Sequence, residues 1–367
     1  MTAHDGGTRP PQHLADLDIP ARRAWMTEIG EKPMRAIQLS HHYFSHLTRD
    51  PEAMTDLPAA DRGRLSAIVL PELAIPRERR VADAGATIKE LLILIGGARI
   101  ETVLMAYPDR VTVCVSTQAG CGMGCPFCAT GQAGLVRNLT AGEIVEQVWR
   151  AARVAREGEL AGGAARLSNV VFMGMGEPLA NYEATVRALR AIAAEPPAGL
   201  GISARNLTVS TCGIVPGMER LAGEGMPVRL AISLHAPDDE LRDTLVPVNK
   251  RFPVANVLDA ARAYTEASGR RISIEYALIR DINDQEWRAD LLARLLLERG
   301  QNWAHVNPIP LNDTPGTRWT ASTPHTSAAF VERLRAAGIV TTIRETRGAD
   351  IDGACGQLAA KEWKEHG

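Results

Sequence analysis

The sequence lacks any apolar run that approaches the roughly 18–20 residues a membrane-spanning helix needs. Its first residues, MTAHDGGTRPPQ, also lack the basic flank and apolar core of a secretory leader. These two absences argue against a membrane partner and against export. We therefore expect a cytoplasmic protein.

A strong excess of one charge is missing as well. The formal net charge is −2, which gives no overall signal for a polyanionic partner. Short basic clusters occur, RERR at 77–80 and KR at 250–251, but solvated surfaces carry such clusters too. Charge alone therefore leaves a nucleic-acid partner open.

The composition changes along the chain and predicts several segments. Residues 1–13 are polar and rich in Gly and Pro, which predicts a disordered tail. Residues 14–80 predict a small helical accessory domain, structural or RNA-facing, in which PARRAWMTEIG stops a helix at Gly30. Residues 81–110 predict a β-rich connector with a Gly-Gly turn in LLILIGGARIE. A C-terminal segment covers 351–367.

Residues 111–350 alternate apolar, strand-like runs with helical segments and lack a Gly-rich dinucleotide-binding loop. One helix start is marked by TAGE at 140–143, which fits a capping box. Continuous apolar strands joined by helices favour a parallel sheet covered by helices. We expect an α/β fold, a partial (β/α)6 barrel whose chemistry lies at the C-terminal ends of its strands. The expected strands are VTVCVS, LSNVVFM, NLTVST, VRLAISL, ISIEYALI, WAHVNPIP and IVTTIRET.

A fourth cysteine is missing from the segment CGMGCPFC, which places Cys121, Cys125 and Cys128 in a C-x3-C-x2-C pattern. Structural zinc sites and common iron–sulfur sites use four protein ligands, and no second C-x2-C or H-x3-H pair follows. Buried structural cysteines would not need this spacing. Either a distant cysteine completes the set, or the fourth position belongs to a ligand outside the protein.

This spacing resembles the signature of the radical S-adenosylmethionine (SAM) superfamily. The resemblance implies a [4Fe–4S] cluster on the three cysteines, with SAM at the open iron, and cleavage of SAM to a 5′-deoxyadenosyl radical. The segment GMGEP resembles the superfamily's contact to the SAM amino group and singles out Gly176 and Glu177. Polar groups at successive strand ends converge on one pocket and add SAM-binding candidates. These are Ser210, Ser233, Leu234, His235 and Asn312.

Two further cysteines stand apart from this loop. Cys355 lies between glycines in RGADIDGACGQL, and Cys114 lies on the strand that leads into the cysteine loop. A thiol in a glycine-flanked loop suits redox or covalent chemistry, whereas a strand cysteine is commonly just buried. The residues by themselves leave both interpretations open.

A closer resemblance covers nearly the whole chain. Several segments, in order, resemble the family of dual-specificity RNA methyltransferases that act on C2 of adenine. Its implied substrates are adenine 2503 of 23S rRNA and adenine 37 of tRNA, its implied electron donor is a flavodoxin or ferredoxin, and we expect a monomer. The segments are GEKPMRAIQ, VCVSTQAGC, GMGEPLAN, SLHAPDDELRDTLVPVNK, IEYALI and TRGADIDGACGQL.

The resemblance also implies a reaction sequence. One SAM methylates Cys355, and the radical from a second SAM activates that methyl group for addition to C2. Cys114 then resolves the RNA–protein adduct through a transient disulfide bond with Cys355. Glu101 matches the family's proposed acceptor of the C2 proton. A radical route suits C2, because this electron-poor carbon is not a competent nucleophile toward SAM.

Two alternatives stay open at this point. A related enzyme methylates C8 of the same rRNA adenine, confers antibiotic resistance and shares the five cysteines. The longer N-terminal region and the C-terminal segment favour C2. A non-catalytic, metal-bearing RNA-binding module would also account for the cysteine loop, but it would have no use for SAM.

Overall fold

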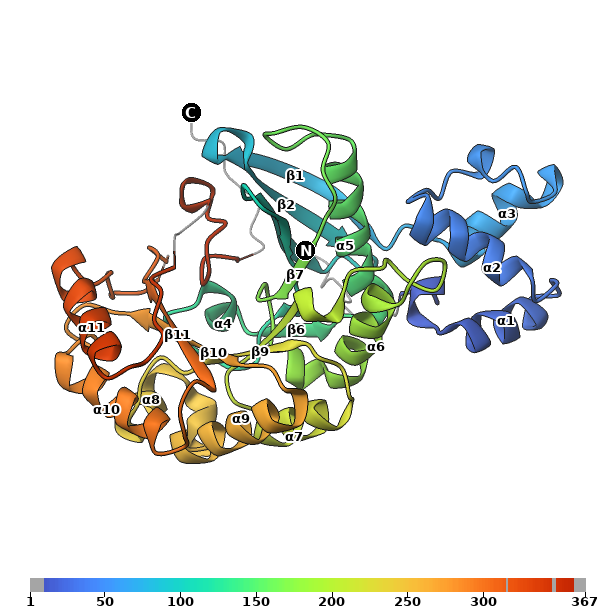
Figure 1. The fold of residues 1–367 in the computed structure, drawn as a ribbon. Helices are drawn as coiled ribbons and strands as arrows, with labels where there is room; N and C mark the ends of the chain where they lie inside the picture. Colours follow the sequence, from blue (N-terminus) through green and yellow to red (C-terminus); the bar gives the residue numbers. More distant parts are fainter. Residues whose placement is uncertain (1–9, 315, 345–347, 360–367) are drawn as a thin grey trace, which may run out of the picture.

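The computed structural model describes residues 10–314, 316–344 and 348–359. The centre of the fold is one curved sheet with the strand order β1-β2-β3-β4-β7-β8-β9-β10-β11 (Figure 1). A separate hairpin pairs β5 with β6. The strands are β1 (Ala74–Ala82), β2 (Thr87–Leu94), β3 (Arg99–Ala106), β4 (Val111–Cys114), β5 (Gln118–Gly120), β6 (Leu135–Asn138), β7 (Asn169–Phe172), β8 (Leu207–Thr211), β9 (Arg229–Ser233), β10 (Ile272–Leu278) and β11 (Ala304–Pro310).

Strands β4, β7, β8, β9, β10 and β11 are parallel to one another, which confirms the predicted partial (β/α)6 barrel. Helices follow the strands and cover the outer face of the sheet, as Figure 1 shows for α6, α7, α9, α10 and α11. The helices of this region are α4 (Ala129–Ala133), α5 (Ala141–Arg156), α6 (Tyr182–Ala193), α7 (Val215–Gly223), α8 (Asp239–Leu245), α9 (Val254–Ser268), α10 (Glu286–Leu297) and α11 (Pro324–Ala336).

The β-rich segment expected as a connector is part of the barrel sheet. β3 pairs antiparallel with β4, and β2 and β1 continue the same sheet outward. The predicted Gly-Gly turn joins β2 to β3, with Gly96 and Gly97 at positive φ. In this extension, β3 provides hydrogen-bond partners for the backbone groups at the edge of β4, which would otherwise be unpaired.

The expected strand IVTTIRET does not form as a strand within the described residues, so that prediction is wrong. Its backbone runs beside β11: Val306 N donates to Val340 O (2.9 Å), and Thr342 N donates to Val306 O (3.1 Å). The next donor along β11 would be residue 308, which is a proline without an N–H group. The ladder is therefore interrupted at Pro308, although Arg344 N still donates to Pro308 O (3.0 Å), and the segment forms an isolated bridge between Val306 and Thr341 in place of a strand.

The N-terminal helices are α1 (Ile19–Glu28), α2 (Arg35–Ser40) and α3 (Ala59–Val69). Strand β1 begins at Ala74, inside the range 14–80 expected for the helical domain, so RERR at 77–80 lies on a strand. Of the expected disordered tail, residues 1–9 lie outside the described residues. His13 is fully buried, and its Nδ1 accepts from Ala15 N at 3.0 Å, so the packed structure begins before residue 14.

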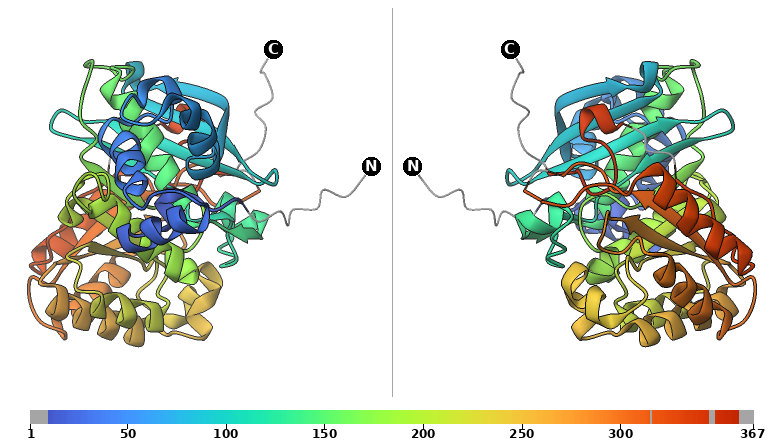
Figure 2. Two further views of the ribbon diagram at one scale, coloured as in Figure 1. Left: turned by 90° about the vertical axis from the view of Figure 1, so that its right-hand side faces the viewer. Right: turned by 90° about the vertical axis from the view of Figure 1, so that its left-hand side faces the viewer.

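The N-terminal region, in blue in Figures 1 and 2, contacts the barrel helices α5 and α6, in green, through the short turn Leu14–Asp16. α5 begins at the predicted capping box of Thr140 and Glu143. Further along α5, the buried Glu146 carboxylate accepts from Tyr43 Oη (2.9 Å) and Arg49 Nη2 (2.5 Å). Buried polar groups of this kind require their partners. The N-terminal helices are therefore docked on the barrel through specific contacts.

No helix in the described part of the chain is long and apolar enough to span a membrane.

Replacing Glu146 with alanine should destabilise this junction. Arg49, whose side chain is only 19% exposed, would lose its closer ion-pair partner and keep only the longer contact to the half-exposed Glu72 (3.8 Å), at a cost of about 3 kcal/mol in the free energy of unfolding. Chemical denaturation measures this change. As a control on the same helix, Glu157→Ala removes an exposed pair with Arg153 and should cost about 0.3–0.5 kcal/mol. Equal effects of the two variants would contradict the docking role of Glu146.

Candidate functional site

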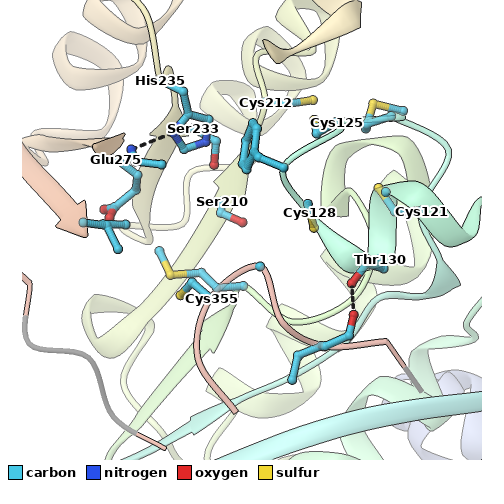
Figure 3. A pocket seen from close by; sticks show the side chains of 18 of the residues that line it. Cys121, Cys125, Cys128, Thr130, Ser210, Cys212, Ser233, His235, Glu275 and Cys355 are labelled. Carbon is cyan, nitrogen blue, oxygen red and sulfur yellow. Dashed lines mark hydrogen bonds between the residues drawn. The ribbon is translucent and has the colours of Figure 1, made fainter. Parts of the chain in front are cut away.

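The main cavity opens at the C-terminal ends of the barrel strands, where the fold predicts the chemistry to lie (Figure 3). Most of the residues predicted from the sequence line it together. They are Cys121, Cys125, Cys128, Gly176, Glu177, Ser210, Ser233, His235, Asn312 and Cys355. Leu234, Glu101 and Cys114 do not line this cavity.

The cysteine loop connects β5 to the short helix α4. Gly131 on α4 faces the backbone of Cys125, where a Cβ atom would lie only 2.8 Å from the Cys125 carbonyl oxygen. Burial raises the pKa of Cys121 to about 11 and also raises that of Cys125. In the described residues, no three His, Cys, Asp or Glu side chains are placed to hold a single metal ion. The three thiols are instead distributed around the cavity wall.

Gly176 and Glu177 follow β7 and are held by close backbone contacts. Gly176 has φ +99°, and a Cβ atom there would lie 2.5 Å from the Gln118 Cβ, so only glycine fits. The Glu177 carboxylate accepts from Leu179 N (3.0 Å) and Cys212 N (2.8 Å). Burial raises the pKa of Glu177. This carboxylate is thus fixed in the cavity wall by backbone donors.

Ser233, the last residue of β9, and His235 lie in the cavity wall. Leu234, between them, does not line the cavity. The Leu234 side chain is fully buried, so any contribution of this residue comes through its backbone. His235 has φ +61°, and its Nδ1 accepts from Ala277 N at 3.0 Å. Burial lowers the pKa of His235 to about 3, so the ring is neutral at physiological pH.

A second, smaller cavity adjoins the first and brings Cys114 and Cys355 together. Both cysteines line it, with Met173 and Arg344, and both are free thiols. Burial raises the pKa of Cys114 to about 12, and the neighbouring Cys355 sulfur adds to this effect. Cys355 is exposed, whereas Cys114 is 8% exposed. The tertiary structure therefore joins two cysteines that are 241 positions apart in the numbering of the chain.

Cys355 belongs to a strap, residues 348–359, that crosses the barrel mouth. On one side, Ala129 N donates to Gly356 O (2.8 Å), and Thr130 Oγ1 donates to Leu358 O (2.5 Å), as Figure 3 shows for Thr130. The Asn312 side chain donates to Cys355 O at 3.0 Å. These contacts attach the strap to α4, which follows the cysteine loop, and to the segment after β11.

On its other side the strap is anchored by a buried ion pair. Lys89 Nζ lies 3.1 Å from Glu101 Oε1, and both side chains are 1% exposed. Lys89 also donates to Asp352 O (2.9 Å), and Glu101 Oε2 accepts from Ala359 N (3.1 Å). Glu101, predicted as a proton acceptor, is thus engaged in holding the strap in this structure.

Three charged residues of this region were not predicted from the sequence. Glu275 lines the main cavity, and its Oε2 lies 3.6 Å from Nη1 of Arg344, which lines both cavities. Arg242 is fully buried below the ends of β8 and β9. Glu275 could have been noticed as the one charged residue in the apolar run ISIEYALI. No comparable signal marks Arg242 or Arg344.

Replacing Lys89 with methionine should loosen the strap while keeping a side chain of similar length. Loss of the buried ion pair should cost about 3 kcal/mol or more. Amide hydrogen exchange in peptides from 348–359 should become faster. Lys250→Met, at an exposed position, serves as the control and should leave this exchange unchanged. Unaltered protection of the strap in Lys89→Met would refute the anchoring role.

Comparisons with known proteins identify the family of the chain. The family model described as the radical SAM superfamily matches residues 115–293, and that of the ribosomal RNA large subunit methyltransferase N-terminal domain matches residues 12–70. The crystal structure of a radical SAM methyltransferase from Sphaerobacter thermophilus is 47% identical, with a TM-score of 0.90, and the match covers 96% of this chain and 100% of that chain.

Curated relatives are similar over almost the full length. A protein of Thermobifida fusca, named probable dual-specificity RNA methyltransferase RlmN, is 61% identical over 353 residues, 96% of each chain. A protein of the same name from Streptomyces coelicolor is 59% identical and covers 99% of this chain and 98% of its own. This chain therefore belongs to the RlmN family of the radical SAM superfamily.

Proposed function

We propose that this chain methylates C2 of adenine 2503 in 23S rRNA and C2 of adenine 37 in tRNAs. The observation that carries the proposal is the pair of free thiols, Cys114 and Cys355, in a cavity beside the one lined by the three loop cysteines. A methyl carrier and a resolving thiol need this proximity. The full-length similarity to proteins named dual-specificity RNA methyltransferase supports the same substrates.

In this proposal, Cys121, Cys125 and Cys128 hold a [4Fe–4S] cluster. The donor set suits the group, because thiolates are the usual ligands of iron–sulfur clusters and the three sulfurs line one cavity with room beside them. When bound, the cluster supplies the electron that cleaves SAM to a 5′-deoxyadenosyl radical. The residues that bind SAM in this proposal are Gly176, Glu177, Ser210, Ser233, Leu234 through its backbone, His235 and Asn312.

Cys355 accepts the methyl group in this proposal, since its thiol is exposed on the strap and lines both cavities. Its thiolate displaces S-adenosylhomocysteine from a first SAM. Hydrogen removal from the S-methyl group then allows the carbon to bond to C2 of the adenine. The adduct radical returns one electron to the redox chain of the proposed donor, and C2 loses its proton. Cys114 then attacks the Cys355 sulfur and forms a disulfide bond; the bond between that sulfur and the methylene carbon breaks, and the carbon takes the electron pair and a proton to become the methyl group of the freed RNA. The electron donor then reduces the disulfide bond to two thiols.

Glu101 is the proposed acceptor of the C2 proton. Its carboxylate is paired with Lys89 and with Ala359 N, so it can act only after the strap has moved away from it. We propose that the strap, which carries Cys355, moves away from Glu101 when the RNA adds to Cys355. The proton acceptor would then become available at the step that needs it.

The target adenine must be unstacked to bring its C2 edge into the barrel mouth. We assign the N-terminal helices a role in holding the folded RNA, since they are docked firmly on α5. A flavodoxin- or ferredoxin-type protein serves as the electron donor, and the enzyme acts in the cytoplasm as a monomer.

Nucleoside mass spectrometry of rRNA and tRNA tests the substrate and the position of the methyl group. In a strain lacking the endogenous gene, this chain should restore 2-methyladenosine in both RNAs. The Cys355→Ala variant should restore none, since the methyl carrier is gone. Appearance of 8-methyladenosine would instead identify the C8 enzyme, and the absence of any methylated adenosine would refute the proposal.

Removing the proposed resolving thiol should stop the reaction at the covalent adduct between RNA and protein. Cys114→Ala, expressed in cells with unmethylated RNA, should be recovered covalently bound to RNA, which denaturing gel electrophoresis detects. The double variant Cys114→Ala/Cys355→Ala should carry none. Cys212→Ala is the matched control, because Cys212 is buried to a similar extent but does not line the cavity of the thiol pair. Recovery of Cys114→Ala free of RNA would rule out this role.

A further inference from the structure

Arg242, on helix α8, is a fully buried arginine with no role in the function proposed above. Its guanidinium donates to backbone carbonyls at the ends of two barrel strands. Nη2 donates to Cys212 O after β8 (2.6 Å), and Nε donates to Leu234 O after β9 (2.9 Å). Arg242 therefore ties together the two strand ends that carry Cys212 and the Ser233–His235 segment.

The positive charge of Arg242 has no carboxylate partner within 4 Å among the described residues. Its guanidinium also donates from Nη2 to Ser233 O (3.3 Å) and from Nη1 to the neutral Asn249 Oδ1 (2.8 Å). Arginine stays protonated even when buried, and a buried charge is costly unless an opposite charge lies nearby. We therefore expect a negatively charged group near Arg242.

Two kinds of group near Arg242 can carry a negative charge. Asn249 Nδ2 donates to the carboxylates of Asp239 (3.0 Å) and Asp243 (2.7 Å), which connects them to Arg242 through Asn249. On the side of the cysteine loop, the candidates are sulfur atoms. Cys125 and Cys128 of the cysteine loop pack with Cys212 and Leu241, the neighbour of Arg242 on α8, in one apolar group. Burial lowers the pKa of Arg242, and the nearby Cys212 and Cys125 sulfurs are the largest influences that oppose this lowering. The guanidinium thus lies beside the loop whose thiols would carry the cluster.

We propose that Arg242 supplies the positive charge that balances the iron–sulfur cluster and raises its reduction potential, an inference that rests on the proposed function of the cysteine loop. A cluster held by thiolates carries a net negative charge, which increases by one when it is reduced. A fixed cation in an apolar environment favours the reduced form, and net charge is a known determinant of cluster potentials. Arg242 is a positioning residue and does not contact substrate.

A second buried arginine provides a matched control. Arg22, on α1, is 1% exposed and donates to Leu14 O (3.0 Å) and Leu17 O (2.9 Å). It also lacks a carboxylate partner within 4 Å among the described residues, but it packs on Phe44 in the N-terminal helices. Loss of Arg22 reproduces the general effect of losing a buried arginine without altering the charge near the cysteine loop.

The test is a redox titration of the anaerobically reconstituted full chain, monitored by electron paramagnetic resonance. The variants are Arg242→Met, Arg242→Lys and Arg22→Met. Arg242→Met should shift the midpoint potential of the cluster to a more negative value and speed iron loss to a chelator. Arg242→Lys, which keeps the charge, should shift it less. Arg22→Met should leave the midpoint unchanged.

A midpoint potential in Arg242→Met equal to that of the unmodified chain would overturn the proposal. So would equal shifts in Arg242→Met and Arg242→Lys, because geometry and not charge would then be responsible. If Arg242→Met does not fold, Arg242→Gln takes its place in the same comparison with Arg242→Lys. Failure of the unmodified chain to form any [4Fe–4S] cluster would refute the proposed function itself, which separates the two outcomes.

Discussion

The buried ion pair between Lys89 and Glu101 anchors the strap that carries Cys355. A charge pair with 1% exposure is retained only where its desolvation is offset by good geometry and further hydrogen bonds. Here those hydrogen bonds go to the backbone of the strap, at Asp352 and Ala359. Cys355 therefore depends for its position on the antiparallel extension β2–β3, which lies outside the parallel barrel.

This dependence explains why the β-rich segment is continuous with the barrel sheet. The pairing of β3 with β4 fixes the extension at the edge of the sheet where Cys114 lies, in register with Val103. The strap then closes over that edge and reaches α4 behind the cysteine loop. One end of the curved sheet thus brings together the resolving thiol, the proton acceptor and the methyl carrier of the proposed reaction.

Electrostatics around the two cavities follow from burial. Desolvation raises the pKa of Cys114, Cys121 and Cys125, so the free protein holds these groups as thiols. Arg344 lines the cavity of the thiol pair, and Arg242 lies near the Cys125 sulfur of the cysteine loop. Each set of sulfurs, which the proposed chemistry requires in anionic form, therefore has a guanidinium nearby, partly exposed in Arg344 and fully buried in Arg242.

Sequence alone determined the features that depend on local pattern. These include the parallel strands from their apolar runs, the start of α5 from its capping box and the cysteine loop from its spacing. The roles of Cys114, Cys355 and Glu101 came only from resemblance, since no spacing relates residues so far apart.

The seventh strand was predicted wrongly, because the proline that interrupts it lies on its neighbour β11. Only the tertiary structure decided which thiols share a cavity, that Glu101 binds the strap, and that the guanidinium of Arg242 lies at the ends of β8 and β9. Those facts depend on contacts across the sheet, which a one-dimensional pattern does not encode.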